Sequence, residues 1–255
     1  MCDCPPPAGK SVFGRGWKSW GTIPEPCVNP SASSWSEASH VLGPNTPAIK
    51  AFGQVRLRYL NQLADSPINV TTLSMVCHIG THLDSPRHFF DDGPSFESIP
   101  LSRLWGPGWV HPVSPAKGLN IEPEDFGAID KKILPGDILV INTGLHEICN
   151  SLAYQNEHPS LSERCANWII EKGIKMICID FPTPEIPVSK RQMTFNFPIH
   201  RMLLSSGVLI AEHLTGLTPF NHCRVEIMVN ALNIEGGDGS PARVLIRKIN
   251  DDRQA

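Results

Sequence analysis

The sequence predicts a single α/β domain in which strands outnumber helices. The chain has 255 residues, of which 41% are hydrophobic and 18% charged, which is the composition of a globular protein with ample chain for a buried core. Its 20 Gly and 24 Pro favour a structure rich in turns and strands over a helix bundle. Apolar, β-branched segments recur along the chain, whereas only a few segments have helical start and stop signals.

Seven segments predict strands because each is short, apolar and rich in β-branched residues. They are residues 69–77, 108–113, 137–142, 174–180, 208–214, 224–230 and 242–247. Three segments predict helices, because Pro123 opens the first while Gly173 and Gly207 stop the others. These helices cover residues 122–130, 161–172 and 198–205, and residues 51–65 also fit a short helix. We therefore expect one domain over residues 51–255.

Residues 1–50 differ from the rest of the chain. They are rich in Pro, Ser, Gly and Trp and have no sustained hydrophobic period, so we expect an irregular N-terminal arm. Trp17, Trp20 and Trp35 would dock this arm on its own domain or on a partner subunit, because exposed Trp is uncommon.

Charge and cysteine content exclude several classes of protein. Lys and Arg number 22 against 25 Asp and Glu, so the basic excess of a nucleic-acid or anionic-membrane binder is missing. No stretch approaches the ~18 apolar residues of a membrane-spanning helix, and the N-terminus does not have the pattern of a secretory signal. The eight Cys form no C-x-x-C pair. We expect a cytoplasmic protein with reduced thiols.

The segment His78-Ile-Gly-Thr-His82-Leu-Asp84-Ser-Pro-Arg-His88 places three His and one Asp close together in the sequence. All spacings from His78 are even, so an extended segment would turn the four side chains to one side, and the Gly and Pro inside it argue against a helix. Imidazole and carboxylate without thiolate are typical ligands of a catalytic Zn²⁺ or Mn²⁺ site. The alternative is a chance group of surface histidines near a Pro turn.

A second group lies downstream. Glu212 falls inside an apolar strand segment, where an unpaired carboxylate costs on the order of several kcal/mol, so it needs a partner such as a metal ion or an Arg. His200 lies at the start of the predicted helix leading into that strand, where it could bind a metal or cap the helix. Strand alternation would turn His213 to the opposite face from Glu212, which argues against His213 as a ligand. Five candidate ligands result, which favours two ions sharing a carboxylate: His78, His82, Asp84, His200 and Glu212.

The motif His78-x-Gly-Thr-His82-x-Asp84-x-Pro-x-His88 resembles the signature of the metal-dependent cyclase-like hydrolases, a family that includes bacterial kynurenine formamidase (arylformamidase) and isatin hydrolase. The resemblance extends from about residue 70 to 247 and includes residues 134–144, 200–212 and 239–243.

The resemblance to the formamidase branch implies roles for the candidate residues. His78, His82 and Asp84 would hold one metal, and Asp84 would bridge to a second metal completed by His200 and Glu212. His88 would transfer protons. The resemblance also implies a β-rich domain with a barrel-like, swivelling β/β/α sheet and a few flanking helices, assembled as a homodimer or homotetramer.

We expect hydrolysis of a non-peptide C–N bond, an aryl formamide or a cyclic amide, in a small aromatic substrate. One or two Zn²⁺ or Mn²⁺ ions would activate water, with His88 as general acid and base. The N-terminal arm would lie over the site, and candidate aromatic contacts are Trp35, Phe89, Phe90 and Trp105. Two alternatives remain open: a lactonase, esterase or cyclase that uses the same activated water, and a metal-binding protein without turnover.

Overall fold

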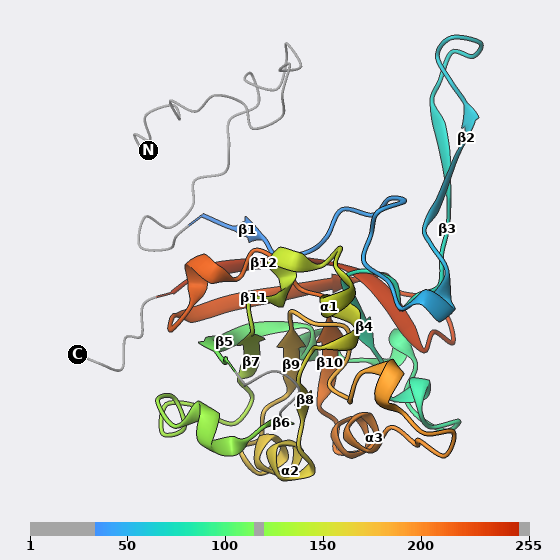
Figure 1. Ribbon diagram of the computed structural model, residues 1–255. Coiled ribbons are helices and arrows are strands. Elements are labelled where there is room, and N and C mark those ends of the chain that lie inside the picture. Colours follow the sequence, from blue (N-terminus) through green and yellow to red (C-terminus); the bar gives the residue numbers. More distant parts are fainter. Residues whose placement is uncertain (1–33, 115–119, 250–255) are drawn as a thin grey trace, which may run out of the picture.

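Seven strands close into a barrel-like sheet in the computed structural model, which describes residues 34–114 and 120–249. Neighbouring strands around the barrel are β12 (Gly239–Lys248), β11 (Arg224–Ala231), β5 (Trp105–Pro112), β7 (Ile138–Asn142), β9 (Met176–Ile179), β10 (Leu209–Glu212) and β4 (His82–Asp84). β4 pairs with β12 again and closes the ring, while the short strand β1 (Ser36–Glu37) extends β12 on its outer edge (Figure 1). The predicted α/β domain with a barrel-like sheet is confirmed.

The barrel has a parallel half and an antiparallel half. β5, β7, β9 and β10 run parallel, and the other neighbours pair antiparallel. β7 is buried along its whole length, as expected for a parallel strand covered on both faces. Ile138 and Val140 join the apolar cluster inside the barrel, whereas Leu139 and Ile141 join the cluster under the helices.

Two helices cover the outer face of the parallel half. α2 (Glu163–Glu171) and α3 (Pro198–Ser205) lie side by side there (Figure 1), and a shorter helix, α1 (Leu152–Asn156), lies near the other end of these strands. The Ser162 hydroxyl accepts a hydrogen bond from the Cys165 N–H and so caps α2. The helices predicted over 161–172 and 198–205 are confirmed, as are the seven predicted strands.

The helix predicted over 122–130 is wrong. Only Pro123–Phe126 is helical there, as a 3₁₀ turn, and Gly127 ends it because glycine is a poor helix former. β6 (Asn120–Ile121), which comes just before this turn in the sequence, pairs parallel with β8 (Ser160–Leu161). Other 3₁₀ turns are Lys50–Phe52, Pro86–His88, Phe96–Ser98, Leu101–Arg103, Leu145–Ile148, Val188–Lys190 and Thr218–Phe220.

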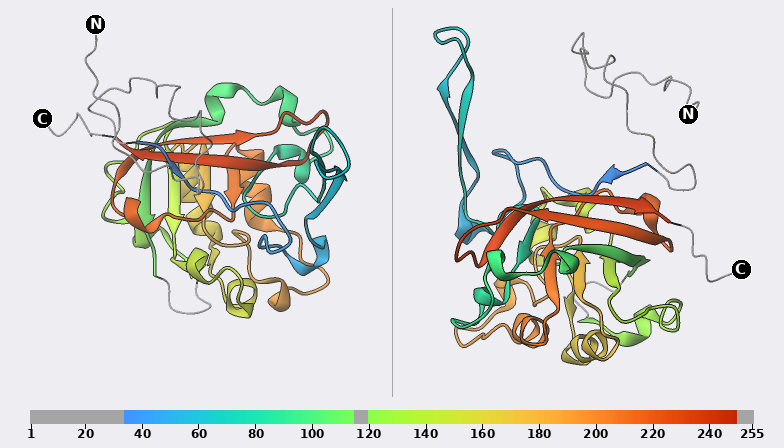
Figure 2. Two further views of the ribbon diagram at one scale, coloured as in Figure 1. Left: turned by 90° about the horizontal axis from the view of Figure 1, so that it is seen from above. Right: turned by 180° about the vertical axis from the view of Figure 1, so that it is seen from behind.

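The short helix suggested for residues 51–65 is also wrong. Apart from the 3₁₀ turn at its start, this segment forms β2 (Arg56–Asn61), which pairs antiparallel with β3 (Val70–Ser74). The apolar residues of β2 fit both periods over so short a stretch, and pairing with the β-branched β3 decides between them. The resulting hairpin projects far from the barrel (Figure 2).

The N-terminal arm is described only in part. Residues 1–33, with Trp17 and Trp20, lie outside the described residues. Among the residues that are described, Trp35 directly precedes β1 and its ring packs 4.5 Å from the Arg247 guanidinium. No helix within residues 34–114 and 120–249 is long and apolar enough to cross a membrane.

His158 is a buried histidine outside the candidate site. Its Nδ1 lies 2.8 Å from the Pro159 carbonyl oxygen, and its ring stacks on Phe181. Burial is the main reason that the pKa of His158 falls to about 4, well below its ordinary value near 6.5. The folded protein therefore holds this imidazole neutral where the unfolded chain would protonate it.

We expect acid to destabilise the fold through this group. Because the unfolded state binds the extra proton between about pH 6.5 and pH 4, stability falls as the pH decreases through that window. At pH 5 the loss from His158 is about 2 kcal/mol. Urea unfolding of His158→Gln at pH 7 and pH 5 should show a smaller loss than the wild-type chain. An equal loss in both proteins would contradict the prediction.

Candidate metal centre and active site

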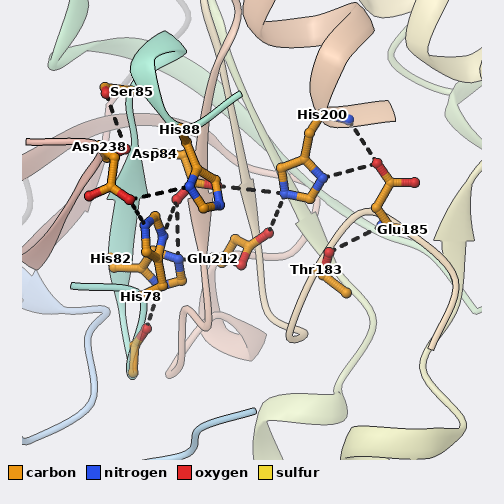
Figure 3. A network of polar contacts seen from close by, with 11 residues as sticks. His78, His82, Asp84, Ser85, His88, Thr183, Glu185, His200, Glu212 and Asp238 are labelled. Carbon is orange, nitrogen blue, oxygen red and sulfur yellow. Dashed lines mark hydrogen bonds and ion pairs between the residues drawn. The ribbon is translucent and has the colours of Figure 1, made fainter. Parts of the chain in front are cut away.

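Strand pairing brings the two predicted groups of ligands together. β4 carries His82 and Asp84, and its antiparallel neighbour β10 places Glu212 directly opposite His82. His200 reaches the same place from α3 (Figure 3). All four side chains are nearly fully buried.

The even spacing of the His78–His88 segment predicted that it is extended throughout. The structure shows that it is not. Only His82–Asp84 is a strand; His78 lies in the turn before it, and His88 ends the 3₁₀ turn that follows. The side chains still converge, because both turns direct their histidines toward the same carboxylates. The segment therefore gathers its histidines by turns at the ends of a three-residue strand.

The two oxygens of Asp84 face two different sets of nitrogen atoms. Oδ1 lies 2.8 Å from His78 Nδ1 and 3.3 Å from His82 Nε2. Oδ2 lies 3.6 Å from His200 Nε2, and this nitrogen is also 3.3 Å from Glu212 Oε1. Two groups of donor atoms, each within 4.8 Å of one another, thus share Asp84: His78 with His82, and His200 with Glu212.

Each histidine in these groups is held by a second partner on its other ring nitrogen. His82 Nδ1 lies 2.7 Å from the Gly80 carbonyl oxygen, and His200 Nδ1 lies 3.0 Å from Glu185 Oε1. His78 Nε2 lies 3.1 Å from Asp238 Oδ2. An acceptor behind the ring fixes the tautomer and orientation of an imidazole and is typical of metal-ligating histidines.

The electrostatics of the group fit a divalent cation. Burial acts to raise the pKa of Asp84, but the hydrogen bond with His78 and the nearby His82 imidazole hold it well below its usual range. Burial and the Asp84 charge raise the pKa of Glu212. His82 Nε2 and Glu212 Oε1 are buried, and their ion-pair contacts, 3.3 Å to Asp84 Oδ1 and 3.3 Å to His200 Nε2, do not have the geometry of hydrogen bonds. Buried imidazole and carboxylate donor atoms that lie close together without well-formed hydrogen bonds are suited to a divalent metal.

His88 lies at the edge of this group. Its ring stacks on the His78 ring, with centroids 3.9 Å apart, and its Nδ1 is 3.4 Å from Asp238 Oδ2. Burial lowers the pKa of His88 to about 4, so the imidazole is neutral near pH 7 and can accept a proton. Asp238 contacts both His78 and His88 and thereby fixes one ring relative to the other.

The predicted aromatic contacts are only partly brought to this place. The Phe89 ring lies 4.5 Å from His88 and 4.8 Å from His200, while Phe90 packs on the apolar cluster under the helices. Trp35 is not gathered with them: it contacts Arg247, near the far end of β12, whereas Gly239 at the near end touches His78. Trp105 is half exposed at the start of β5.

Sequence reasoning missed three residues of the site. Glu185 and Asp238 lie in loops and have no periodicity, although Asp238 directly precedes the Gly239–Arg243 part of the motif. The alternation argument against His213 does not hold, because β10 ends at Glu212 and His213 has φ of 56°. Its ring therefore turns toward His82, with centroids 5.8 Å apart, and Tyr154 contacts its other side.

Comparison with known proteins identifies the family. A model of the family described as putative cyclase matches residues 36–186, more than half of the chain. The chain belongs to this family. The resemblance predicted from the His78–His88 motif is thus confirmed.

Curated relatives and solved structures agree with this membership. The kynurenine formamidase of Bacillus thuringiensis (strain Al Hakam) is 29% identical over 183 residues, which are 71% of this chain and 81% of that protein. The kynurenine formamidase of Salinibacter ruber is 26% identical over 73% of this chain and 84% of its own length. An isatin hydrolase bound to the product analogue thioisatinate has the same fold, with a TM-score of 0.76 at 20% identity over 85% of this chain and 92% of that one. A potential metal-dependent hydrolase with cyclase activity has a TM-score of 0.70 at 25% identity over 85% and 98%.

Glu185 provides a test of the metal centre. We expect Glu185→Gln to weaken metal binding by about 10- to 100-fold, because the amide no longer holds His200 by its negative charge. Competition with a chromogenic chelator would measure the affinity. The exposed Glu163 on α2 supplies the control Glu163→Gln, which should bind metal like the wild-type chain. Equal affinities for all three proteins would refute this role of Glu185.

Proposed function

We propose that the protein is a metal-dependent hydrolase that cleaves a C–N bond other than a peptide bond in a small, aromatic amide or cyclic amide. The observation that carries the proposal is the sharing of Asp84 between two groups of buried donors, with a neutral His88 beside them. The kynurenine formamidase relatives support a hydrolase of this class.

We propose that His78, His82 and Asp84 hold one divalent ion and that Asp84, His200 and Glu212 hold a second. Zn²⁺ and Mn²⁺ are the metals that suit this mixture of imidazole and carboxylate ligands. A bound divalent ion would polarise the carbonyl group of the substrate and lower the pKa of a water molecule in the site.

The chain's own residues would move the protons. Asp238 Oδ2 lies 3.4 Å from Nδ1 of His88, which would favour a proton on Nδ1 and would leave the lone pair of Nε2 to accept a proton. His88 takes a proton from the attacking water as the new C–O bond forms. It then gives that proton to the nitrogen as the C–N bond breaks, which leaves a carboxylic acid and a free amine. Phe89, half buried beside His88 and His200, would contact the ring of the substrate, with Phe90 behind it.

An ester or lactone hydrolase or a cyclase would use the same groups, and a metal-binding protein without turnover would use only the ligands. His88 favours an enzyme, because it lies at the edge of the donor groups in a form that accepts protons. The relatives favour the C–N bond.

We expect the purified protein to contain Zn²⁺ or Mn²⁺ and to hydrolyse N-formylkynurenine or isatin faster than simple lactones. His88→Ala should keep the metal but lose about 10²- to 10⁴-fold in kcat, because a general acid and base is removed. Elemental analysis and steady-state kinetics would measure both.

The control for this test is His222→Asn, an exposed histidine whose positive φ asparagine tolerates. It should retain wild-type activity. A metal-free protein of full activity would refute the metal proposal, and loss of metal from His88→Ala would make His88 a ligand.

We also propose that the chain forms a homodimer or homotetramer and works in the reducing cytoplasm. Buried free thiols at Cys165 and Cys178 support the reducing setting. The β2–β3 hairpin supports the oligomer, because it projects from the barrel and exposes Leu57, Tyr59, Leu60, Leu63, Ile68 and Leu73. Two strands alone are marginally stable in water, and exposed apolar surface of this kind marks contact sites between proteins.

The double substitution Leu60→Glu, Leu63→Glu should reduce the molecular mass in solution, because it places charges on this apolar surface. Light scattering after size exclusion would measure the mass. Leu134→Glu, at an exposed leucine away from the hairpin, is the control and should keep the wild-type mass. An unchanged mass of the hairpin variant would exclude the hairpin from the interface.

A further inference from the structure

The candidate site is open to solvent on the side of His88. The side chain of His88 is 24% exposed and that of Asp238 is 52% exposed, whereas His82 and His200 are nearly fully buried. Phe89 follows His88 in the chain and is half-buried, and its ring contacts the rings of both His88 and His200. A substrate that enters from this side therefore meets the Phe89 ring next to the proposed metal ligands.

Arg201 of α3 lies against the same aromatic ring. Its Cζ is 5.6 Å from the centre of the Phe89 ring and 5.7 Å from that of the Phe90 ring, which are the distances of a cation–π contact. Two hydrogen bonds hold the guanidinium in place. Nε donates to the Asn196 carbonyl oxygen over 3.0 Å, and Nη1 donates to the Phe89 carbonyl oxygen over 3.3 Å.

This guanidinium has no acidic partner. Arg201 is exposed, and among the described residues it makes no ion pair and its Nη2 makes no hydrogen bond. A guanidinium that is already fixed and still has free N–H groups is suited to bind a carboxylate, because its planar fork matches the two carboxylate oxygens. Arg201 therefore offers an accessible anion site at the edge of Phe89.

A second guanidinium lies on the adjoining aromatic rings. Arg191 Cζ is 5.0 Å from the centres of the Phe195 and Phe197 rings, and the Phe197 ring lies 5.3 Å from that of Phe89. Within the described part of the chain Arg191 forms no ion pair either. Two such positive charges favour an anionic ligand over a neutral one. Since Nη2 of Arg191 is buried, Arg201 is the guanidinium that a ligand can reach.

We propose that Arg201 is a specificity-determining residue that binds a carboxylate group of the substrate while the aromatic ring of that substrate lies on Phe89. The scissile C–N bond then lies at the His88 edge of the Phe89 ring, and the carboxylate lies at the Arg201 edge. The inference rests on the proposed hydrolase function and names its substrate class. This class is an aromatic amide that carries a carboxylate, in preference to a neutral cyclic amide.

The alternative is a purely structural role, in which Arg201 ties α3 to the segment that carries His88 and Phe89. Loss of such a tie would displace His88 and would lower kcat for charged and neutral substrates alike. Loss of a carboxylate contact would instead raise KM for the anionic substrates alone, because the groups around the scissile bond are unchanged. Two substrates that differ only in charge therefore distinguish the two roles.

The test uses the full-length protein with its metal. The substrates are the ortho, meta and para isomers of formamidobenzoate, each compared with its uncharged carboxamide. The variants are Arg201→Gln and Arg201→Lys. The control Arg164→Gln removes an exposed arginine of α2, which pairs with Glu122 and Glu124. Steady-state kinetics give kcat and KM, calorimetry gives the affinity for the aminobenzoate products, and elemental analysis gives the metal content.

We expect the wild-type chain to prefer at least one formamidobenzoate isomer over its carboxamide. Arg201→Gln should raise KM for that isomer by about 10- to 100-fold, the effect of losing a charge-assisted hydrogen bond, and should weaken binding of the matching aminobenzoate. Its kcat, its metal content and its kinetics with the carboxamide should stay close to those of the wild type. Arg201→Lys should recover part of the loss, because it keeps the charge but not the planar fork. Arg164→Gln should match the wild type.

An anion preference that Arg201→Gln retains would overturn the proposal. So would equal kcat/KM of the wild-type chain for each acid and its carboxamide, or a failure to bind or hydrolyse any of the three acids. A fall in kcat of Arg201→Gln on both members of a pair would assign Arg201 the structural role. If the wild-type chain hydrolyses no C–N substrate but binds an aminobenzoate through Arg201, the proposed function fails and the assignment of Arg201 stands.

Discussion

The burial of the Asp84 carboxylate is the constraint on which the rest of the structure depends. This group is almost fully removed from water, although an isolated buried carboxylate is strongly destabilising. Its two oxygens are surrounded by three imidazoles, and each of these has an acceptor of its own behind the ring. The free-energy cost of burying the Asp84 carboxylate is thus offset by an ordered set of partners. This set extends to the loops that carry Glu185 and Asp238.

Barrel closure supplies the rigidity that this arrangement needs. β4 has only three residues, yet it pairs with β10 on one edge and with β12 on the other, so both backbone edges of Asp84 are fixed. Gly239 on β12 lies opposite Asp84, and a Cβ there would clash with the His78 ring. The strand pairing that closes the barrel therefore also positions the proposed metal ligands.

The sequence predicted the features that depend on local pattern. Buried parallel strands such as β7 and the helices α2 and α3 have strong patterns with clear ends, and these predictions are confirmed. The hairpin was missed, because the residues of β2 fit two periods and the choice depends on β3, which follows later in the chain. The five predicted ligands converge, although by turns rather than by an extended strand.

Other parts of the site could not be predicted because they depend on tertiary contact. Asp238 meets His78 from 160 residues away, and nothing in the loop around it has a period. His213 was set aside on the assumption that β10 continues beyond Glu212, which its positive φ contradicts. The positive φ of His213 thus determines on which side of the sheet its imidazole lies. The pattern of side chains in the sequence does not predict this angle.

The same geometry links metal binding to folding. With Asp84 and Glu212 buried side by side, each negative charge disfavours the other, and the raised pKa of Glu212 follows from burial and from this neighbour. A divalent cation between them would remove that repulsion and also bind His82 Nε2 and Glu212 Oε1, which make no hydrogen bond among the described residues. Since a cation bound only by the folded state stabilises that state by mass action, metal binding and barrel closure would reinforce each other. A metal bound at the candidate site would then stabilise the strand pairing of β4. With only three residues, β4 has little pairing energy of its own to keep the barrel closed.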